Sequence, residues 1–293
     1  MVLSPLAGIT IPPFRRLCAE FGAITVSEMT FARGLLYRDP KSMRRIERAE
    51  TEKKFGVQLL TNNPSDLGKA IEFLDTNNIC DFVELNLGCP KPKITNAQLG
   101  ADLLKRKNHS LLRDLFEIGS TTSNLPFSLK IRAGFSDKVF SQVLKIAEKE
   151  NIAFVTFHAR LVSDNYQIPV NDDYWREASE ITNIPIIANG DIRSYREADE
   201  LLNQNYISGV AIGRAARGNP QIFQKRAVTN ILDIYNRLIA YMRGTSYFNP
   251  FNLRVQSSDF IKHFRYAANA RKELLALDQP EAIIEKTRDL LDQ

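Results

Sequence analysis

Eight short apolar runs, each followed by a segment with helical periodicity, constrain the fold of this chain more than any other feature of its sequence. The runs are Val2–Ala7, Ala23–Ser27, Phe55–Leu59, Phe82–Leu87, Phe127–Ile131, Ala153–Phe157, Ile184–Ala188 and Gly209–Ile212. Several contain Val, Ile and Phe on consecutive positions, which is typical of strands covered on both faces. Strands that alternate with helices predict a parallel sheet joined by crossover helices.

Helical patterns fill the gaps between these runs, at Pro12–Glu20, Pro64–Asn77, Gly100–Lys105, Leu111–Thr121, Lys138–Glu150, Trp175–Ile181 and Tyr195–Asn203. Eight strand and helix units in succession predict an α/β fold, a closed (β/α)8 TIM barrel; the alternative is a doubly wound open sheet, which has the same local pattern. After Pro220 only helices are expected, at Ile222–Met242, Ser258–Leu277 and Pro280–Leu291, with a turn-rich break at Gly244–Asn252. We therefore expect a barrel at residues 1–224 and a small all-helical C-terminal domain at residues 225–293.

The composition limits the class of protein and its partners. Apolar residues make up 44% of the chain and charged residues 25%, as in ordinary globular proteins. The net charge is +5, and residues 225–293 hold 11 basic against 8 acidic residues, so over half of the excess lies in the predicted helical domain. This distribution is compatible with an anionic partner and equally with a solvated basic helix.

The three cysteines, Cys18, Cys80 and Cys89, show no paired spacing. This pattern favours a reducing compartment and contains no zinc motif. The first residues lack the pattern of a signal peptide, and no apolar run approaches the roughly 18 residues of a membrane span. We expect a soluble, cytoplasmic, monomeric protein without a metal ion.

Polar residues and glycines recur just beyond the strand ends, where an α/β barrel forms its active site. They are Gln58, Asn86, Cys89, Lys130, Arg132, His158, Arg160, Asn189-Gly190-Asp191 and Gly213-Arg214. The two side-chain amides, Gln58 and Asn86, suit the edge of a heterocycle, and Lys130 offers a fixed cation. The glycines and the arginine after the last two strands lie where barrels often bind phosphate. The set predicts a site for flavin mononucleotide (FMN).

In combination these motifs resemble the tRNA-dihydrouridine synthase family over residues 2–224. The matching segments are Pro5-Leu6-Ala7-Gly8-Ile9-Thr10, Pro13-Phe14-Arg15, Ser27-Glu28-Met29, Val57-Gln58-Leu59, Leu85-Asn86-Leu87-Gly88-Cys89-Pro90, Leu129-Lys130-Ile131-Arg132, Phe157-His158-Ala159-Arg160, Ile187-Ala188-Asn189-Gly190-Asp191, Ile212-Gly213-Arg214-Ala215 and Gly218-Asn219-Pro220. The resemblance implies an FMN-containing catalytic barrel and a helical tRNA-binding domain. It further implies reduction of the C5=C6 bond of uridine in tRNA, with NADPH as the external reductant.

The resemblance also implies roles for individual residues. The flavin would contact Pro5, Leu6, Ala7, Gln58, Lys130, His158, Asn189, Gly190, Asp191, Gly213 and Arg214. Substrate contacts would come from Asn86, which lies beside the uracil, and from Arg132, Arg160, Lys262, Arg265 and Arg271. Cys89 would be the catalytic proton donor.

The chemistry expected of Cys89 follows from the reaction. Hydride transfer from flavin N5 to C6 of uracil builds enolate character on C5 and O4, so an acid on the opposite face must protonate C5. A cysteine thiol is mostly protonated at neutral pH and can act as that acid. His158, Lys130 and Arg132 could stabilise the charge that develops on the uracil or the flavin. Cys18 and Cys80 lack such a setting and are expected to be small buried hydrophobic residues.

The chain departs from the family pattern at three places. Leu6 stands where Met is usual, Gln98-Leu99-Gly100-Ala101 replaces a Gly-x-Gly-Ala run, and Leu161 and Tyr166-Gln167-Ile168 replace a Thr and a Tyr-x-Gly segment. Leu6 should keep a hydrophobic wall against the flavin but change its shape, so the cofactor site stays intact. The other two departures fall on the substrate loops. Substrate choice is therefore the property that they affect.

RNA contact is also suggested by two basic stretches, Arg38–Arg48 and Lys262-His263-Phe264-Arg265-Tyr266, although a solvated amphipathic helix has the same pattern. Two other functions share parts of the sequence pattern. A dihydroorotate-dehydrogenase-like flavoenzyme would act on a free pyrimidine and has no evident need for a basic helical domain. An RNA-binding chaperone that kept the barrel without its chemistry would have no need for Cys89, Lys130 and His158.

Overall fold

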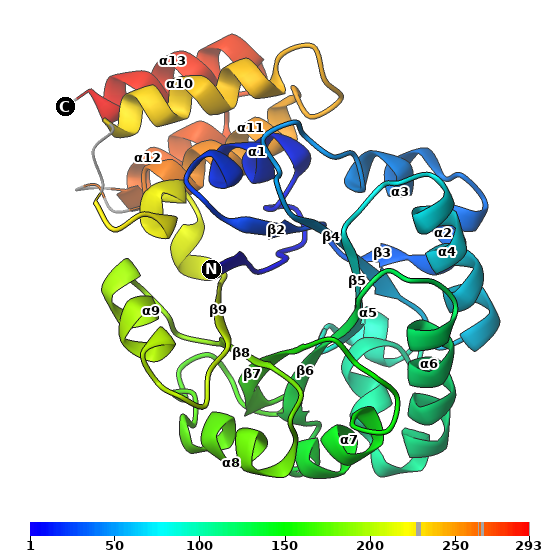
Figure 1. Cartoon of the computed structure of the whole chain (residues 1–293). Coiled ribbons are helices and arrows are strands. Elements are labelled where there is room, and N and C mark those ends of the chain that lie inside the picture. Colours follow the sequence, from blue (N-terminus) through cyan, green and yellow to red (C-terminus); the bar gives the residue numbers. More distant parts are fainter. Residues whose placement is uncertain (227–229, 263, 265–266, 293) are drawn as a thin grey trace.

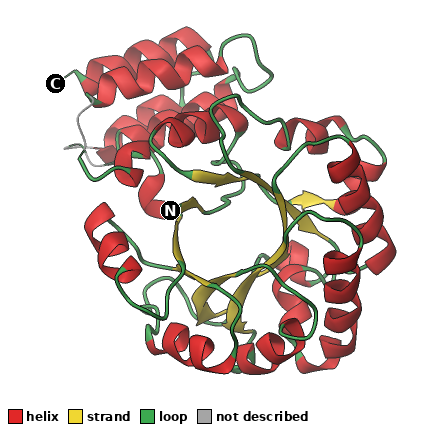
Figure 2. Ribbon diagram, viewed as in Figure 1, coloured by secondary structure: helices red, strands yellow, loops and turns green. Residues whose placement is uncertain are grey.

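Eight parallel strands close into a barrel in the computed structural model, which describes residues 1–226, 230–262, 264 and 267–292 (Figure 2). The strands are β1 (Val2–Leu3), β2 (Ile24–Val26), β4 (Phe55–Leu60), β5 (Phe82–Leu87), β6 (Phe127–Gly134), β7 (Val155–Leu161), β8 (Ile186–Asn189) and β9 (Gly209–Ile212). Strand β1 pairs with both β2 and β9, and pairing of β2 with β4 closes the ring. The predicted (β/α)8 barrel is confirmed, and the open doubly wound sheet, which would leave two unpaired edges, is wrong.

The first strand is shorter than the apolar run that predicted it. The run extends to Ala7, whereas β1 ends at Leu3. The amide of Ser4 still donates to the carbonyl of Ile212 over 2.8 Å, but Pro5 has no N–H with which to continue the ladder. Residues 5–7 therefore form a loop at the mouth of the barrel instead of a strand.

Helices cover the outside of the barrel between successive strands (Figure 1). They are α1 (Pro12–Glu20), α4 (Pro64–Thr76), α6 (His109–Thr121), α7 (Phe140–Ala147), α8 (Asp173–Ile181) and α9 (Tyr195–Leu202), and each was predicted within a few residues. The expected helix at residues 100–105 is a 3-10 segment, Gly100–Leu104, with a second 3-10 turn at Arg106–Asn108. The strand β3 (Thr30–Phe31) and the short helices α2 (Ala32–Leu36), α3 (Pro40–Arg45) and α5 (Pro92–Thr95) were not predicted.

The C-terminal region is helical, as predicted, but its helices begin at other residues. It contains α10 (Ile231–Met242), α11 (Pro250–Phe260), α12 (Ala267–Leu275) and α13 (Pro280–Leu291). The expected helix from Ile222 is wrong at its start, since a 3-10 turn occupies Pro220–Phe223 and Asn230 caps α10 by accepting from the amide of Leu232. The expected helix Ser258–Leu277 is wrong because α11 ends at Phe260 and α12 begins at Ala267.

The helical region packs on one side of the barrel and continues its hydrophobic core. Figure 1 shows α10, α11 and α13 beside α1 on one side of the barrel. Their buried residues belong to the same apolar cluster as those of the strands and of α1. Polar contacts reinforce the junction, because the hydroxyl of Tyr241 donates to Glu20 and the side chain of Gln256 donates to the carbonyl of Ile9. In the part of the chain that the structure describes, no helix is both long and apolar enough to span a membrane.

Candidate active site

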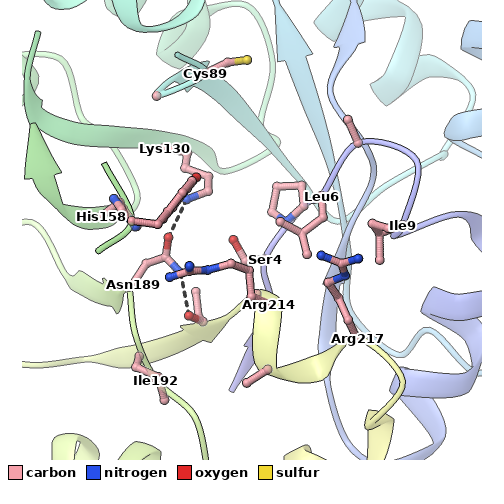
Figure 3. A pocket seen from close by; sticks show the side chains of 18 of the residues that line it. Ser4, Leu6, Ile9, Cys89, Lys130, His158, Asn189, Ile192, Arg214 and Arg217 are labelled. Atoms are coloured by element: carbon pink, nitrogen blue, oxygen red, sulfur yellow. Dashed lines mark hydrogen bonds between the residues drawn. The ribbon is translucent and has the colours of Figure 1, made fainter. Parts of the chain in front are cut away.

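A cavity of about 890 Å³ opens at the carboxyl ends of the strands and contains most of the predicted site residues. Its walls include Pro5, Leu6, Ala7, Gln58, Asn86, Cys89, Lys130, Arg132, His158, Asn189, Gly190, Asp191, Gly213, Arg214 and Lys262. Figure 3 shows Lys130, His158 and Asn189 together on one side, and Leu6 and Ile9 on another, with Cys89 apart from both groups. Residues distant in sequence thus converge because parallel strands present their carboxyl ends at a single mouth.

Lys130 and His158 form the cationic and aromatic side of the cavity. The Lys130 ammonium donates to the Oδ1 atom of Asn189 over 2.8 Å, and the amide of Asn189 donates to the carbonyl of Ala211 over 2.7 Å (Figure 3). Burial lowers the pKa of Lys130 to about 8, opposed by the nearby carboxylate of Glu84. Lys130 is thus a cation at neutral pH and loses its charge at mildly alkaline pH.

His158 is a neutral ring at physiological pH. Burial and the positive charges around it, first that of Arg132, lower the pKa of His158 to about 2. Its Nδ1 atom is buried and has no hydrogen-bond partner among the described residues. A buried ring nitrogen without a partner is rare in a folded protein, so it is a candidate contact for a ligand in the cavity.

The end of the cavity beyond β8 and β9 combines glycines with cations. Arg214 contacts Asp191 over 2.7 Å, and Asp191 also pairs with the buried Arg160. At Gly190 a side chain would have its Cβ only 2.4 Å from Cγ1 of Val170, and the φ angle of +122° also favours glycine. This end offers glycine backbone that lines the cavity and a guanidinium, the combination that binds phosphate in many proteins.

A chain of buried amides leads to the loop that carries Cys89. Gln58 accepts a hydrogen bond from the side chain of Asn86 over 2.7 Å. Asn86 in turn accepts from the backbone amides of Gly88 at 3.2 Å and Cys89 at 3.0 Å. Cys89 lines the cavity and is partly exposed, whereas Cys18 and Cys80 are buried, and burial raises the pKa of Cys80 to about 12. Of the three cysteines, only Cys89 therefore lines the cavity.

Arg132 ties together two loops at the mouth. Its guanidinium donates to the carbonyl of Gly88 over 3.1 Å, to that of Leu161 over 2.9 Å and to the hydroxyl of Tyr166 over 3.2 Å. The Tyr166 ring is more than half exposed and lies 4.2 Å from the guanidinium carbon of Arg214. The loop after β5 and the loop after β7 are thus held at fixed positions relative to each other.

A second, smaller cavity of about 290 Å³ adjoins the first at the junction with α11 and α12. Its walls are Arg214, Arg217, Ser258, Asp259, Lys262 and Arg271. Arg217 forms a two-point ion pair with Asp259, and Lys262 donates to the carbonyl of Arg214 over 3.4 Å. Cations outnumber carboxylates in this wall by four to one, so the site favours an anion.

Two predicted substrate residues, Arg160 and Arg271, do not line the main cavity, and a third, Arg265, cannot be placed. Arg160 is buried behind it, where it pairs with Asp191 and donates to the carbonyl of Ile168 over 2.6 Å. Arg271 lines the smaller cavity. Arg265 lies outside the described residues, as do His263 and Tyr266 of the same basic stretch.

Several residues at the site were not among the predicted set. Met29 and Tyr166 line the main cavity, and Arg217 lines both cavities. Glu84 is buried and accepts a hydrogen bond from Gln58, which lines the main cavity. A signal was present for Glu84, since it precedes Asn86 by two positions in an apolar strand and so shares its face. No sequence signal pointed to Arg217, because its position depends on how α11 packs against the barrel.

The lining suits a flat heterocycle with an anionic group at one end. Leu6, Ile9 and Met29 offer an apolar wall, the amides and Lys130 can contact a polar ring edge, and Arg214 lies at the phosphate-like end. Among the residues that the structure describes, no three His, Cys, Asp or Glu side chains come close enough to hold a metal ion.

Comparisons with known proteins identify relatives along most of the chain. The family model described as "Dihydrouridine synthase (Dus)" matches residues 2–243. A "Probable tRNA-dihydrouridine synthase" of Helicobacter pylori is 35% identical over 226 residues, which cover 76% of this chain and 68% of that protein. The "tRNA-dihydrouridine synthase B" of Xanthomonas campestris is 27% identical over 310 residues, covering 100% of this chain and 92% of that protein.

Solved structures with a similar barrel are more distant in sequence. An old yellow enzyme homologue from Zymomonas mobilis has a TM-score of 0.57 at 14% identity, covering 80% of this chain and 91% of that one. Morphinone reductase has a TM-score of 0.52 at 11% identity, covering 76% and 84%. At these identities the likeness shows the fold alone.

Proposed function

Because this chain belongs to the dihydrouridine synthase family, we propose that it reduces the C5=C6 bond of uridine in tRNA to give dihydrouridine. The observation that carries the proposal is the position of Cys89, whose loop meets Gln58, Asn86 and Lys130 at one cavity. These groups suit a pyrimidine beside a second heterocycle. tRNA as substrate also implies a cytoplasmic location, and we propose it for that reason.

We propose FMN as the cofactor, held by the cavity residues already described. The fit rests on three observations: the backbone at Gly190 that excludes a side chain, the guanidinium of Arg214 nearby, and the unpartnered Nδ1 atom of His158. When bound, the flavin supplies the hydride that is transferred to C6 of the uracil. NADPH is proposed as the external reductant on the basis of the family alone.

The chain's own residues then have distinct tasks. Asn86 is proposed to orient the uracil, and Lys130 and Arg132 to stabilise negative charge on its carbonyl oxygens. The thiol of Cys89 gives its proton to C5, and the resulting thiolate regains a proton from solvent. His158, which is neutral, can contact a polar ring atom without adding charge.

We propose that residues 225–293, together with the smaller cavity, bind the RNA. Lys262 and Arg271 line that cavity, and it opens beside the main one at Arg214 and Arg217. A backbone phosphate next to the target nucleotide would meet these cations. A uridine must leave its stack to reach a barrel mouth, so the substrate is a flipped or already unstacked base.

The central test is turnover of the purified chain with FMN, NADPH and tRNA that lacks dihydrouridine. Cys89→Ala should keep its flavin and reduce turnover at least about 100-fold, since general acid catalysis contributes about 10²–10⁴-fold. Mass spectrometry of digested tRNA measures the product, and Cys80→Ala is the control that keeps activity. Unchanged turnover in Cys89→Ala would remove its assigned role. Reduction of a free pyrimidine but not of tRNA would favour the dihydroorotate-dehydrogenase-like alternative.

The RNA site is tested by Arg271→Gln. We expect weaker tRNA binding and a salt dependence that is shallower by about one unit in a double-logarithmic plot, because one phosphate contact is lost. Lys272→Gln is the matched control, since Lys272 is exposed at the next position of α12 and outside the cavity. Equal effects of both changes on the salt dependence would contradict a phosphate site at Arg271.

A further inference from the structure

Glu84 is a buried carboxylate that the proposed reaction does not use. It lies on β5 two residues before Asn86, and the strand register places it opposite Gln58 of β4. Its side chain is 1% exposed, and it forms no ion pair within the described residues. A buried carboxylate is costly unless hydrogen bonds compensate for the lost water, so its partners should reveal why it is there.

Both oxygens of Glu84 accept hydrogen bonds. The side-chain amide of Gln58 donates to Oε1 over 2.7 Å, and the hydroxyl of Thr156 donates to Oε2 over 2.9 Å. Beyond Gln58 the chain continues through Asn86 to the backbone amides of Gly88 and Cys89. One continuous series of hydrogen bonds therefore connects the carboxylate to the loop that carries the proposed proton donor.

The carboxylate sets the direction of this series. A carboxylate can only accept, so Gln58 must turn its NH2 group toward Glu84 and its oxygen toward Asn86. Asn86 must then donate to Gln58 and turn its own oxygen toward the N–H of Cys89. The reverse direction would place the NH2 group of Asn86 against the N–H of Cys89, with two donors facing each other.

We infer that Glu84 is a positioning residue that fixes the direction of the Gln58 and Asn86 amides and thereby holds the Cys89 loop in place. The catalytic importance of that loop rests on the proposed function, whereas the positioning does not. Burial raises the pKa of Glu84, and this rise is opposed by the charge of Lys130 and by the hydrogen bonds from Gln58 and Thr156. These three groups therefore favour the carboxylate form on which the direction of the series depends.

The inference is tested by Glu84→Gln, which has the same shape but can donate as well as accept. With a glutamine at position 84, Gln58 finds a hydrogen-bond partner there in either direction. The reverse direction turns the NH2 group of Asn86 toward the N–H of Cys89 and so releases the loop. We expect hydrogen exchange of the Gly88 and Cys89 amides to become roughly tenfold faster. The exchange is measured at single-residue resolution, on variants that carry equal amounts of flavin. In the reduction assay, the factor by which kcat falls should exceed the factor by which KM for tRNA rises.

Two further variants separate direction from packing. Thr156→Val removes one donor to Glu84 but leaves the carboxylate that accepts from Gln58. Amide exchange in the loop should therefore change less than about threefold. The double variant Glu84→Gln with Asn86→Asp reverses only the two hydrogen bonds made by Gln58. The introduced glutamine donates to Gln58, and the introduced aspartate accepts from Gln58 and, as Asn86 does, from the loop amides. Slow exchange should return in this variant.

Specific outcomes decide the matter. Slow exchange in Glu84→Gln alone, or exchange in the double variant as fast as in the single one, would overturn the inference. If Glu84→Gln does not fold, the double variant still must fold and protect the loop, and its failure overturns the inference as well. These exchange rates do not depend on uridine reduction, so they separate this inference from the proposed function, which Cys89→Ala tests.

Discussion

At the scale of single residues, the charge state of Lys130 controls what the cavity can bind. Its ammonium faces the cavity beside Asn189, and no carboxylate forms an ion pair with it among the described residues. Its pKa is lowered to about 8, because burial disfavours the charged form. An anionic or electron-rich ligand stabilises the charged form of a buried lysine of this kind. Lys130 is therefore suited to a site for a flavin.

We predict that FMN binding weakens as the pH rises through about 8. Below this pH Lys130 is charged in the free protein, and above it the neutral amine must take up a proton when FMN binds. The dissociation constant should then rise by up to about tenfold per pH unit until the pKa of the complex is reached. Quenching of flavin fluorescence between pH 7 and 9 measures this.

Two variants identify the titrating group in that measurement. Lys130→Gln should bind FMN more weakly at pH 7 and lose the pH dependence between 7 and 9. Cys89→Ala, which removes the thiol that lines the same cavity, should retain it. A pH dependence that survives in Lys130→Gln would contradict the assignment.

The position of a side chain could be predicted where it follows directly from the end of a strand. Gln58, Asn86 and Lys130 could be placed at the mouth from the sequence because each lies at the end of an apolar run. Arg160 was expected at the substrate, but its side chain turns behind the cavity to Asp191. The direction of a side chain past a strand end depends on the loops around it, which the apolar pattern does not describe.

At the scale of elements, the strands were predictable and the loops between them were not. Each barrel strand is covered on both faces, so burial imposes an apolar run that stands out in the sequence. The short helix α3 begins instead at a local signal, since Asp39 accepts from the amide of Ser42 and Pro40 follows it. The same signal at Asn249 and Pro250 starts α11, within a segment that was expected to be a break.

The link between the loops after β5 and β7 gives a prediction at this scale. Arg132→Lys keeps the charge but cannot make the three hydrogen bonds to Gly88, Leu161 and Tyr166 at once. We expect tRNA reduction to fall at least about tenfold, because small displacements of reacting groups are costly in rate. The rate of dihydrouridine formation measures this effect, and thermal unfolding of the same variant shows whether it is folded.

Arg193→Lys is the matched control for this change. Arg193 also lines the cavity, and its side chain is exposed. Its replacement should leave turnover within about threefold. A similar loss for both variants would mean that guanidinium groups contact the RNA generally and that the loop link is unimportant.

At the scale of the whole molecule, the barrel and the helical region behave as one packed body. Their apolar residues form a single cluster, and α11 contacts the mouth through Gln256, which donates to Ile9, and through Asp259, which pairs with Arg217. The sequence predicted a helical appendage from its change of pattern. It contained no signal for how closely this region packs, because a contact such as that between Gln256 and Ile9 joins residues more than 200 positions apart.

The last prediction concerns this junction and uses two glycines with left-handed backbone. A Cβ on Gly218, whose φ is +63°, would lie 2.1 Å from the carbonyl oxygen of Asp259, so Gly218→Ala must push α11 away from the barrel. At Gly244, whose φ is +75°, nothing lies within 4 Å of such a Cβ. Both changes should cost roughly 1 kcal/mol of unfolding free energy from backbone strain, and Gly218→Ala about 1–3 kcal/mol more from the overlap.

Urea unfolding measures the difference between the two variants, and tRNA binding shows its functional consequence. Gly218→Ala should also weaken tRNA binding, because displacement of α11 separates Lys262 from Arg217 in the smaller cavity. Gly244→Ala should bind tRNA normally when folded. Equal losses of stability in the two variants would show that α11 can move away from the barrel at no cost in unfolding free energy. In that case α11 could not hold the cavity wall in place.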